Sequence, residues 1–233
     1  GVPFTVMQNG NRKYIAQSGL IGAQGIDKAS GRPNYQTSSS SYTQTGEDPL
    51  VVDLEYVATN GLNVTKRFTF TKSGYSVNVE YIINNTATSA ASVQMYAQLI
   101  QSTVVESGSA LMPTYRGAAY STTEDRYEKY DFDDIKETKL NVTTAGGWVA
   151  MLEHYFVSAW VPNQTEDNQI YSSYSTNSEA IIGYKTPSLT IQPNSQAITS
   201  ALFYVGPKDQ YVLDEIAPFL GLTIDYGFLS MIS

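Results

Sequence analysis

Strict alternation of side-chain type over residues 75–83, YSVNVEYII, constrains the fold of this chain more than any other feature. Every second residue from Tyr75 to Ile83 is aromatic or apolar, and the residues between them are mainly polar. Because successive side chains of a β-strand point to opposite faces, this pattern predicts a strand with one buried face. Similar runs and two turn pairs surround it: LVVDLEYVA (50–58), Asn60–Gly61, LNVTKRFTFT (62–71), Ser73–Gly74 and SVQMYAQLI (92–100). We therefore predict an antiparallel meander over residues 50–101.

The other ordered segments are also short and strand-like: KYIAQS, GWVAML, HYFVSAWV, AIIGYK, SLTIQP and ITSALFYVG. One helix is predicted over about residues 207–220, because Pro207 suits a first turn and Gly221 suits the position after the last turn. Pro218 should loosen its final turn. Its apolar stripe has a period of 3.6 and consists of Val212, Leu213, Ile216, Phe219 and Leu220. The chain is thus predicted to be mainly β, a large antiparallel sandwich closed by a C-terminal amphipathic α-helix.

Composition excludes several classes of function. The 233 residues include no cysteine, which excludes thiol catalysis, thiolate metal sites and disulfides. The net charge of -8 disfavours nucleic acid as a partner. No apolar run approaches the ~20 residues of a membrane-crossing helix, so we expect this fragment to be soluble. The chain starts and stops within its patterns, and we expect both ends to be boundaries inside a longer protein.

The segment GGWVAMLEHYFVSAWVP (146–162) holds both tryptophans and the only histidine. It is either an active site or a densely packed strand pair. His154 has no evident partner for catalysis, since Glu153 would point to the opposite face of a strand. One histidine also cannot form a site with several histidine ligands. We predict a hairpin of two strands with apolar residues on both faces, lying between two layers.

The densest charged segment is EDRYEKYDFDDIKE (124–137). Asp131, Asp133 and Asp134 resemble Ca²⁺ ligands, but the glycine and the distal glutamate of an EF-hand loop are missing. A solvated surface or a protein-docking surface fits better, given the tyrosines nearby. No GxSxG, P-loop or HExxH motif occurs, and no carboxylate pair stands out for glycosidic chemistry. We predict no catalytic residue, no metal site and no cofactor.

Five segments resemble the large periplasmic domain of the YidC/Oxa1/Alb3 family of membrane protein insertases, in its Gram-negative form. They are YIAQSGLIG (14–22), YRGAAYSTTEDRYEKYDFDDI (115–135), GGWVAMLEHYFVSAWVP (146–162), YVGPKDQ (204–210) and LTIDYGFLSMIS (222–233). The resemblance implies a galactose mutarotase-like β-supersandwich at the periplasmic face of the inner membrane, between the first two transmembrane helices of the parent protein. Residues 1–221 would form this domain, without its natural start, and residues 222–233 would lead into an interfacial helix and the second transmembrane helix.

In that family the transmembrane core carries insertion, and that core is not in this chain. The resemblance implies contacts with SecDF and the SecYEG translocon, while nascent inner-membrane proteins are handled by the parent protein. The SecDF-contacting zone would fall within about residues 115–160, and the predicted helix would couple the domain to the membrane. Candidate partner-binding residues are Arg116, Tyr120, Tyr127, Lys129, Tyr130 and Asp133.

Two alternatives stay open. A carbohydrate-binding or mutarotase-like sandwich would use the many tyrosines and the tryptophans to stack on sugar rings. A single histidine, however, cannot assemble the Glu and histidine set that sugar epimerisation of that type resembles. A domain that chaperones emerging polypeptide through an exposed edge strand or groove is the second alternative.

Overall fold

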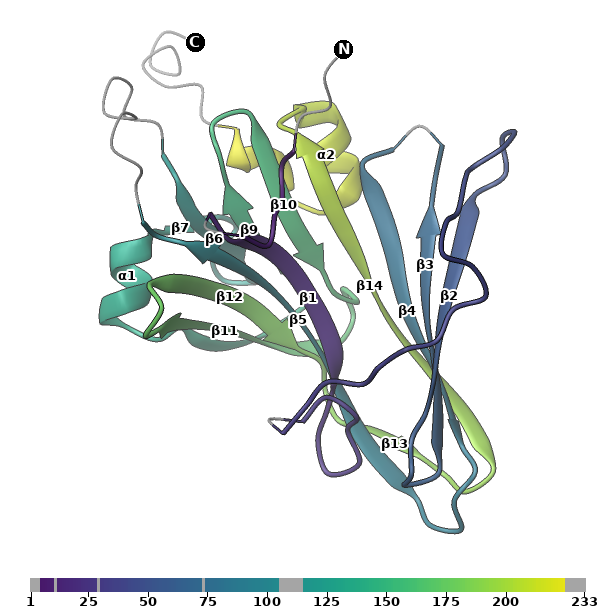
Figure 1. Ribbon diagram of the computed structural model, residues 1–233. Helices are drawn as coiled ribbons and strands as arrows, with labels where there is room; N and C mark the ends of the chain where they lie inside the picture. Colours follow the sequence, from purple (N-terminus) through teal and green to yellow (C-terminus); the bar gives the residue numbers. More distant parts are fainter. Residues whose placement is uncertain (1–4, 11, 29, 73, 105–114, 225–233) are drawn as a thin grey trace, which may run out of the picture.

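The computed structural model describes residues 5–10, 12–28, 30–72, 74–104 and 115–224, which form two antiparallel β-sheets (Figure 1). The six-stranded sheet has the order β1 (Tyr14–Ile21), β5 (Ala91–Ser102), β12 (Glu179–Lys185), β11 (Asp167–Ser175), β8 (Asn141–Ala145), and β13 (Leu189–Ile191) also pairs with β5. The eight-stranded sheet has the order β2 (Leu50–Val57), β3 (Leu62–Phe70), β4 (Ser76–Asn85), β14 (Ser195–Pro207), β10 (Phe156–Val161), β9 (Trp148–Leu152), β6 (Gly117–Ser121), β7 (Glu128–Tyr130). The helical elements are α1 (Phe132–Glu137), α2 (Gln210–Ile216) and η1 (Leu220–Thr223).

The main hydrophobic core lies between the two sheets. Almost every long strand buries the side chains of one face in this core, as the alternation in the sequence predicts. Tyr81 and Ile83 from β4 and Leu99 from β5 are fully buried in it. The mainly β sandwich is therefore confirmed. No helix in the described part of the chain is long and apolar enough to cross a bilayer.

The predicted meander is right for three strands and wrong for the fourth. β2, β3 and β4 pair in sequence order, with Asn60–Gly61 at the first turn; Ser73 of the second predicted turn lies outside the described residues. β5 does not pair with β4 but crosses to the six-stranded sheet, and β14 takes the place beside β4. At this corner the buried Asn85 amide donates to the carbonyls of Ser89 at 2.9 Å and Ile191 at 3.0 Å. Alternation shows which face of a strand is buried, but it does not show which strand pairs with it.

Lys66 lies on the core-facing side of β3 and reaches the edge strand of the other sheet. Its Nζ donates to the carbonyl oxygen of Ser18 on β1 at 3.3 Å. The ammonium also lies 5.3 Å from the ring centre of Phe68 and 5.2 Å from that of Tyr81. Burial lowers the pKa of Lys66 to about 8, and the nearby Asp27 partly offsets this effect. β1 is an edge strand, and this hydrogen bond engages one of its outward-facing carbonyl groups. The strand is therefore less able to pair with a strand of another chain.

We expect the stability difference between the natural chain and Lys66→Met to depend on pH. The folded chain holds Lys66 at a pKa of about 8, whereas lysine in an unfolded chain titrates near about 10.4. Between these values the unfolded state binds more protons, so stability rises with pH. Relative to Lys66→Met, the natural chain should gain about 1–2 kcal/mol from about pH 7 to pH 9.5, measured by urea unfolding. A difference for Lys66→Met that is constant across this range would contradict the burial of its ammonium.

Candidate functional site

The β9–β10 hairpin is buried on both faces, as predicted. On β9, Val149 and Met151 enter the core between the sheets, whereas Trp148 and Leu152 enter a second hydrophobic cluster on the outer face. On β10, Trp160 joins the main core and Val157 the outer cluster.

Both tryptophans of the hairpin are packing residues with their polar atoms satisfied. Trp148 is 1% exposed and Trp160 is 3% exposed. The Trp148 indole donates to the carbonyl of Pro218 at 2.9 Å, and that of Trp160 donates to the carbonyl of Gln98 at 3.2 Å. His154 lies exposed at the turn between the strands, beside the ring of Tyr155. The sequence cluster therefore marks a packed strand pair.

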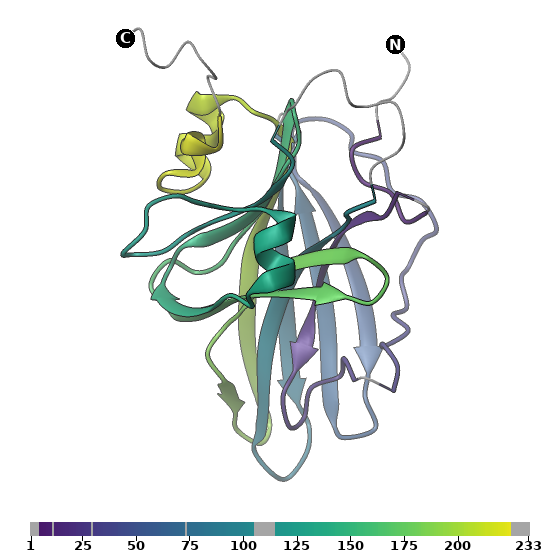
Figure 2. The same ribbon diagram turned by 90° about the vertical axis from the view of Figure 1, so that its left-hand side faces the viewer.

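The C-terminal helical segment, α2 with η1, covers the outer face of this hairpin (Figure 2). Leu213, Ala217 and Leu220 are buried in the outer cluster. Asp209 forms the N-cap of α2, and its carboxylate accepts from the backbone of Tyr211 at 3.0 Å and Val212 at 3.4 Å. The apolar side of this seven-residue helix packs on the outer face of β9, which shields Trp148 from water.

The helix predicted over residues 207–220 is real but shorter at both ends. Pro207 is the last residue of β14, not a first-turn residue. At the other end, Ala217 is extended with φ −158° and ψ 150°. A proline disfavours helical geometry in the residue before it and lacks a donor of its own, so Pro218 ends the helix. Phe219 then takes a left-handed conformation with φ 66°, and η1 follows.

β6 and β7 form the far edge of the eight-stranded sheet, and α1 follows β7 and packs on β11 and β12 of the other sheet. We name β6, β7 and α1 the edge surface. Tyr120 of β6 and Tyr130 of β7 pack edge to face, with ring centres 6.0 Å apart. Burial raises the pKa of both phenols, so they stay protonated at neutral pH. The Tyr130 hydroxyl donates to the carbonyl of Thr138 at 2.5 Å. These contacts fix a short β-strand and a short helix at the end of the sheet.

α1 lies inside the charged segment and is not predicted from the sequence pattern. Asp131 is its N-cap and accepts from the backbone of Asp133 and Asp134, both at 2.9 Å. Asp134 in turn accepts from the backbone of Asp131 at 3.0 Å, which completes a capping box. Two of the three aspartates considered as Ca²⁺ ligands thus serve the helix start. Within the described ranges, no group of acidic or histidine side chains is arranged to hold a metal ion.

The edge surface and the C-terminal helical segment meet in three dimensions, although the sequence separates them. Tyr127 packs against Trp148 with ring centres 6.2 Å apart, and Trp148 bonds to Pro218. The Arg126 guanidinium lies 5.2 Å from the ring centre of Phe219. We name this contact region the junction; it joins the two sets of residues that the sequence analysis proposed for partner binding and for membrane coupling.

The six predicted partner-binding residues lie in one region but differ in exposure. Lys129 and Asp133 are exposed, and the Lys129 ammonium lies 4.8 Å from the ring centre of Tyr115. Arg116 is half-buried, and its guanidinium bonds to Glu153 at 3.2 Å and to the carbonyl of Ser102 at 2.9 Å. Arg116 therefore stabilises the strand ends rather than presenting a free charge.

Sequence reasoning missed two contributors, Arg126 and Glu153. The contact of Arg126 with Phe219 depends on the left-handed turn after α2, for which Pro218 is only an indirect signal. The Glu153 carboxylate accepts hydrogen bonds from the side chains of Arg116 and Gln101. Its second oxygen lies 3.7 Å from the Arg12 guanidinium. No spacing in the sequence indicates these long-range pairs.

The family described as the YidC periplasmic domain matches residues 1–233, which is the whole chain. The chain belongs to the YidC periplasmic domain family. A curated relative, the membrane protein insertase YidC of Pseudoalteromonas atlantica, is 50% identical over 220 residues, covering 94% of this chain and 40% of the relative. The chain thus spans about two fifths of the length of the curated YidC proteins that it matches.

Solved structures that resemble this YidC domain have low sequence identity to it. The α-galactosidase AgaA of Geobacillus stearothermophilus superposes with a TM-score of 0.53 at 9% identity, over 88% of this chain and 29% of that chain. A galactose mutarotase-like protein of Clostridium acetobutylicum gives a TM-score of 0.48 at 6% identity, over 74% and 66% of the two chains. At 9% identity the likeness to AgaA shows the fold alone.

Proposed function

We propose that this chain is a non-catalytic interaction domain of an insertase that integrates and folds inner-membrane proteins, alone or with the Sec translocon. The junction is the observation that carries the proposal. It joins an exposed, charged edge to the C-terminal helical segment through packed aromatic rings. A partner that docks on the edge surface is therefore mechanically connected to the last described element of the chain.

Several observations support a role without catalysis. The single histidine lies on an exposed turn, and Glu153 beside it is engaged by arginines. The alternative of a sugar-binding sandwich needs aromatic side chains that can reach a ligand. Trp148 and Trp160 are both buried and cannot stack on a sugar ring without unfolding their surroundings. The tryptophans therefore give no support to the carbohydrate alternative.

The edge surface has the chemistry of a protein interface, and we assign SecDF as its partner. Two charges of opposite sign are exposed here: the Lys129 ammonium lies over the ring of Tyr115, and Asp133 lies in the first turn of α1. Such a charged rim around aromatic residues suits protein–protein contacts. Its hydrogen-bonded tyrosines are already ordered, so binding costs less conformational entropy.

The C-terminal helical segment is proposed as the part that faces the membrane. The first described residues and α2 lie at the same end of the sandwich in two views (Figures 1 and 2). Tyr211 is 85% exposed and Leu222 is 49% exposed at this end. Aromatic side chains with a polar tip suit the interface between water and lipid. In the parent protein, this end would lie next to the transmembrane helices.

A pull-down of SecDF by the full-length insertase tests the docking surface. Exchanging the charges in Lys129→Glu with Asp133→Lys leaves the net charge unchanged and should lower SecDF recovery several-fold. The matched control exchanges the exposed pair Glu47→Lys with Lys72→Glu near the opposite edge of the same sheet. Equal recovery with both double variants would contradict the assignment of SecDF to the edge surface.

A further inference from the structure

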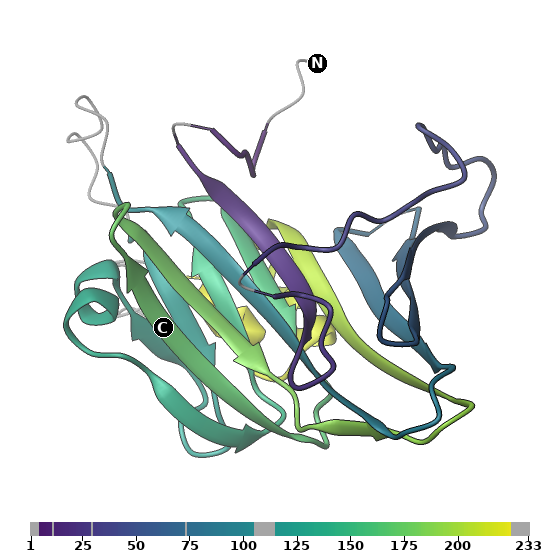
Figure 3. The ribbon, with the colours of Figure 1, turned by 60° about the horizontal axis from the view of Figure 1, so that its bottom comes forward.

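A shallow depression of about 310 Å³ lies on the outer face of the six-stranded sheet, away from the edge surface and the junction. β1, β5 and β12 form its floor, and in Figure 3 they lie in front of α2 and the eight-stranded sheet. The segment after β1 provides one wall. The lining side chains belong to Ile21, Asp27, Lys28, Arg32, Tyr96, Gln98, Tyr171 and Lys185.

Two glycines in the floor allow side chains to lie flat across the sheet. A Cβ at Gly183 would lie 2.8 Å from the Tyr171 hydroxyl, and one at Gly19 would lie 2.6 Å from the Tyr96 ring and 2.5 Å from the Asp27 carboxyl carbon. Gly183 pairs with Tyr171 on β11, and Gly19 pairs with Tyr96 on β5. The Tyr96 side chain therefore lies over Gly19 and the Tyr171 side chain over Gly183. The depression lies between the two tyrosines.

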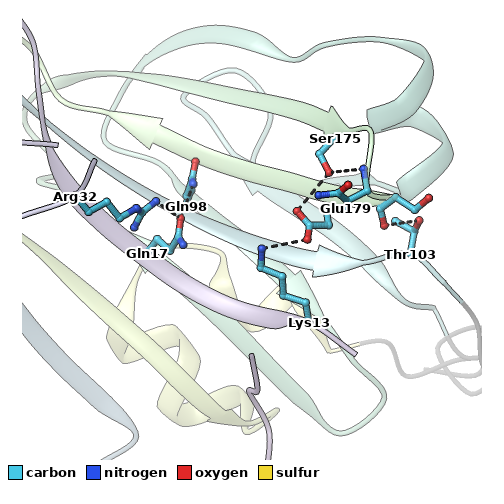
Figure 4. A network of polar contacts seen from close by, with 9 residues as sticks. Lys13, Gln17, Arg32, Gln98, Thr103, Ser175 and Glu179 are labelled. Atoms are coloured by element: carbon cyan, nitrogen blue, oxygen red, sulfur yellow. Dashed lines mark hydrogen bonds and ion pairs between the residues drawn. The ribbon is translucent and has the colours of Figure 1, made fainter. Parts of the chain in front are cut away.

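A chain of hydrogen bonds orders the polar groups of this surface (Figure 4). The Arg32 guanidinium donates to Gln17 Oε1 at 2.8 Å, and Gln98 Nε2 donates to the same oxygen at 3.0 Å. The Tyr171 hydroxyl donates to Gln98 Oε1 at 2.8 Å. The hydrogen bond to Gln17 orients the Arg32 guanidinium. A guanidinium has five N–H donors, so others remain available to a ligand.

Positive charge gathers here although the chain as a whole is acidic. Lys28, Arg32 and Lys185 all line the depression. Within the described part of the chain, none of these three has a carboxylate within ion-pairing distance; Lys185 lies 5.1 Å from the ring centre of Tyr171. One carboxylate, Asp27, also lines the depression and accepts from the Leu20 backbone at 2.8 Å, so the lining still carries more positive than negative charge. Three cations in one depression attract an anion against the net charge of -8.

We propose that this depression binds a small polar molecule that carries a phosphate or carboxylate group. Arg32 offers the forked geometry that these anions favour, and Lys28 and Lys185 add two point charges. Tyr96 and Tyr171 flank the space for the body of the ligand. The site uses other side chains than the junction, because Tyr127, Trp148 and Phe219 do not line it.

Titration of the domain with glycerol 3-phosphate, followed by amide chemical shifts, tests this site. We expect saturable shifts at residues 17–19, 96–98 and 183–185, and none with glycerol. Arg32→Gln combined with Lys185→Gln should weaken binding by about tenfold or more, because two charged contacts are lost. Lys72→Gln, in the turn after β3 of the other sheet, should leave the affinity unchanged. A thermal melt of each variant confirms that the fold is retained.

A second arm identifies the source of the anionic group. Co-sedimentation with phosphatidylglycerol vesicles that is lost in the Arg32 and Lys185 double variant supports the site with a lipid headgroup as ligand. Binding of glycerol 3-phosphate without vesicle binding supports it with a free metabolite. Absence of both saturable shifts with millimolar glycerol 3-phosphate and vesicle binding that depends on Arg32 and Lys185 would overturn the proposal, and so would equal affinity in the double variant and Lys72→Gln.

Discussion

Replacing Trp148 with alanine lowers the free energy of unfolding by about 3–5 kcal/mol, because a large buried side chain is lost. Trp148 is 1% exposed and lies between Tyr127 and the C-terminal helical segment. Its removal leaves a cavity in the outer cluster and deprives the Pro218 carbonyl of its donor. Urea unfolding followed by circular dichroism measures the loss.

Two comparisons make this result specific. Tyr155→Ala, in the turn of the same hairpin and 70% exposed, should change stability by less than about 0.5 kcal/mol. Trp160→Ala, in the main core, should cost about 3–5 kcal/mol like Trp148→Ala. A Trp148→Ala variant that keeps its stability but loses binding to a glycan would instead favour the carbohydrate alternative.

Replacing Leu213 with alanine should cost about 2–5 kcal/mol and release α2 from the sheet. Leu213 is fully buried in the outer cluster, and α2 has only seven residues. An isolated helix of that length is not stable in water, so its packing decides whether it forms. Hydrogen exchange should show at least about tenfold faster exchange in α2, while β3 and β4 keep their protection.

Tyr211→Ala is the matched control, since Tyr211 lies on the same helix and is 85% exposed. It should leave the exchange of α2 within about twofold of the natural chain. If Leu213→Ala left α2 protected, the helix would be held by something other than the outer cluster. The proposed mechanical connection between the edge surface and the C-terminal helical segment would then lose its basis.

The sequence was sufficient for most strands because their burial leaves a local pattern. Alternation identified β4, and Asn60–Gly61 identified the β2–β3 turn. Which strands pair with one another was not predictable, because β5 and β4 carry the same alternation but belong to different sheets. α1 was missed because its six residues contain a single buried position, Ile135, too few to produce a helical period.

The candidate sites were only partly predictable. Aromatic and charged residues marked the edge surface, since such composition is itself a local signal. The junction depends on contacts across 70 residues, from Trp148 to Pro218, which no spacing reveals. The anion-binding depression depends on Gly19 and Gly183, which look like ordinary strand glycines until their cross-strand neighbours are known.

The most direct test of the account is site-specific photocrosslinking in living cells. A photoreactive residue at Lys129 or Asp133 of the full-length insertase should capture a Sec component, and one at Lys72 should capture much less. Such a difference would support docking through the edge surface by a domain that works as a packed platform. If positions 129 and 133 captured no Sec component, or if position 72 captured as much, the central claim would be wrong.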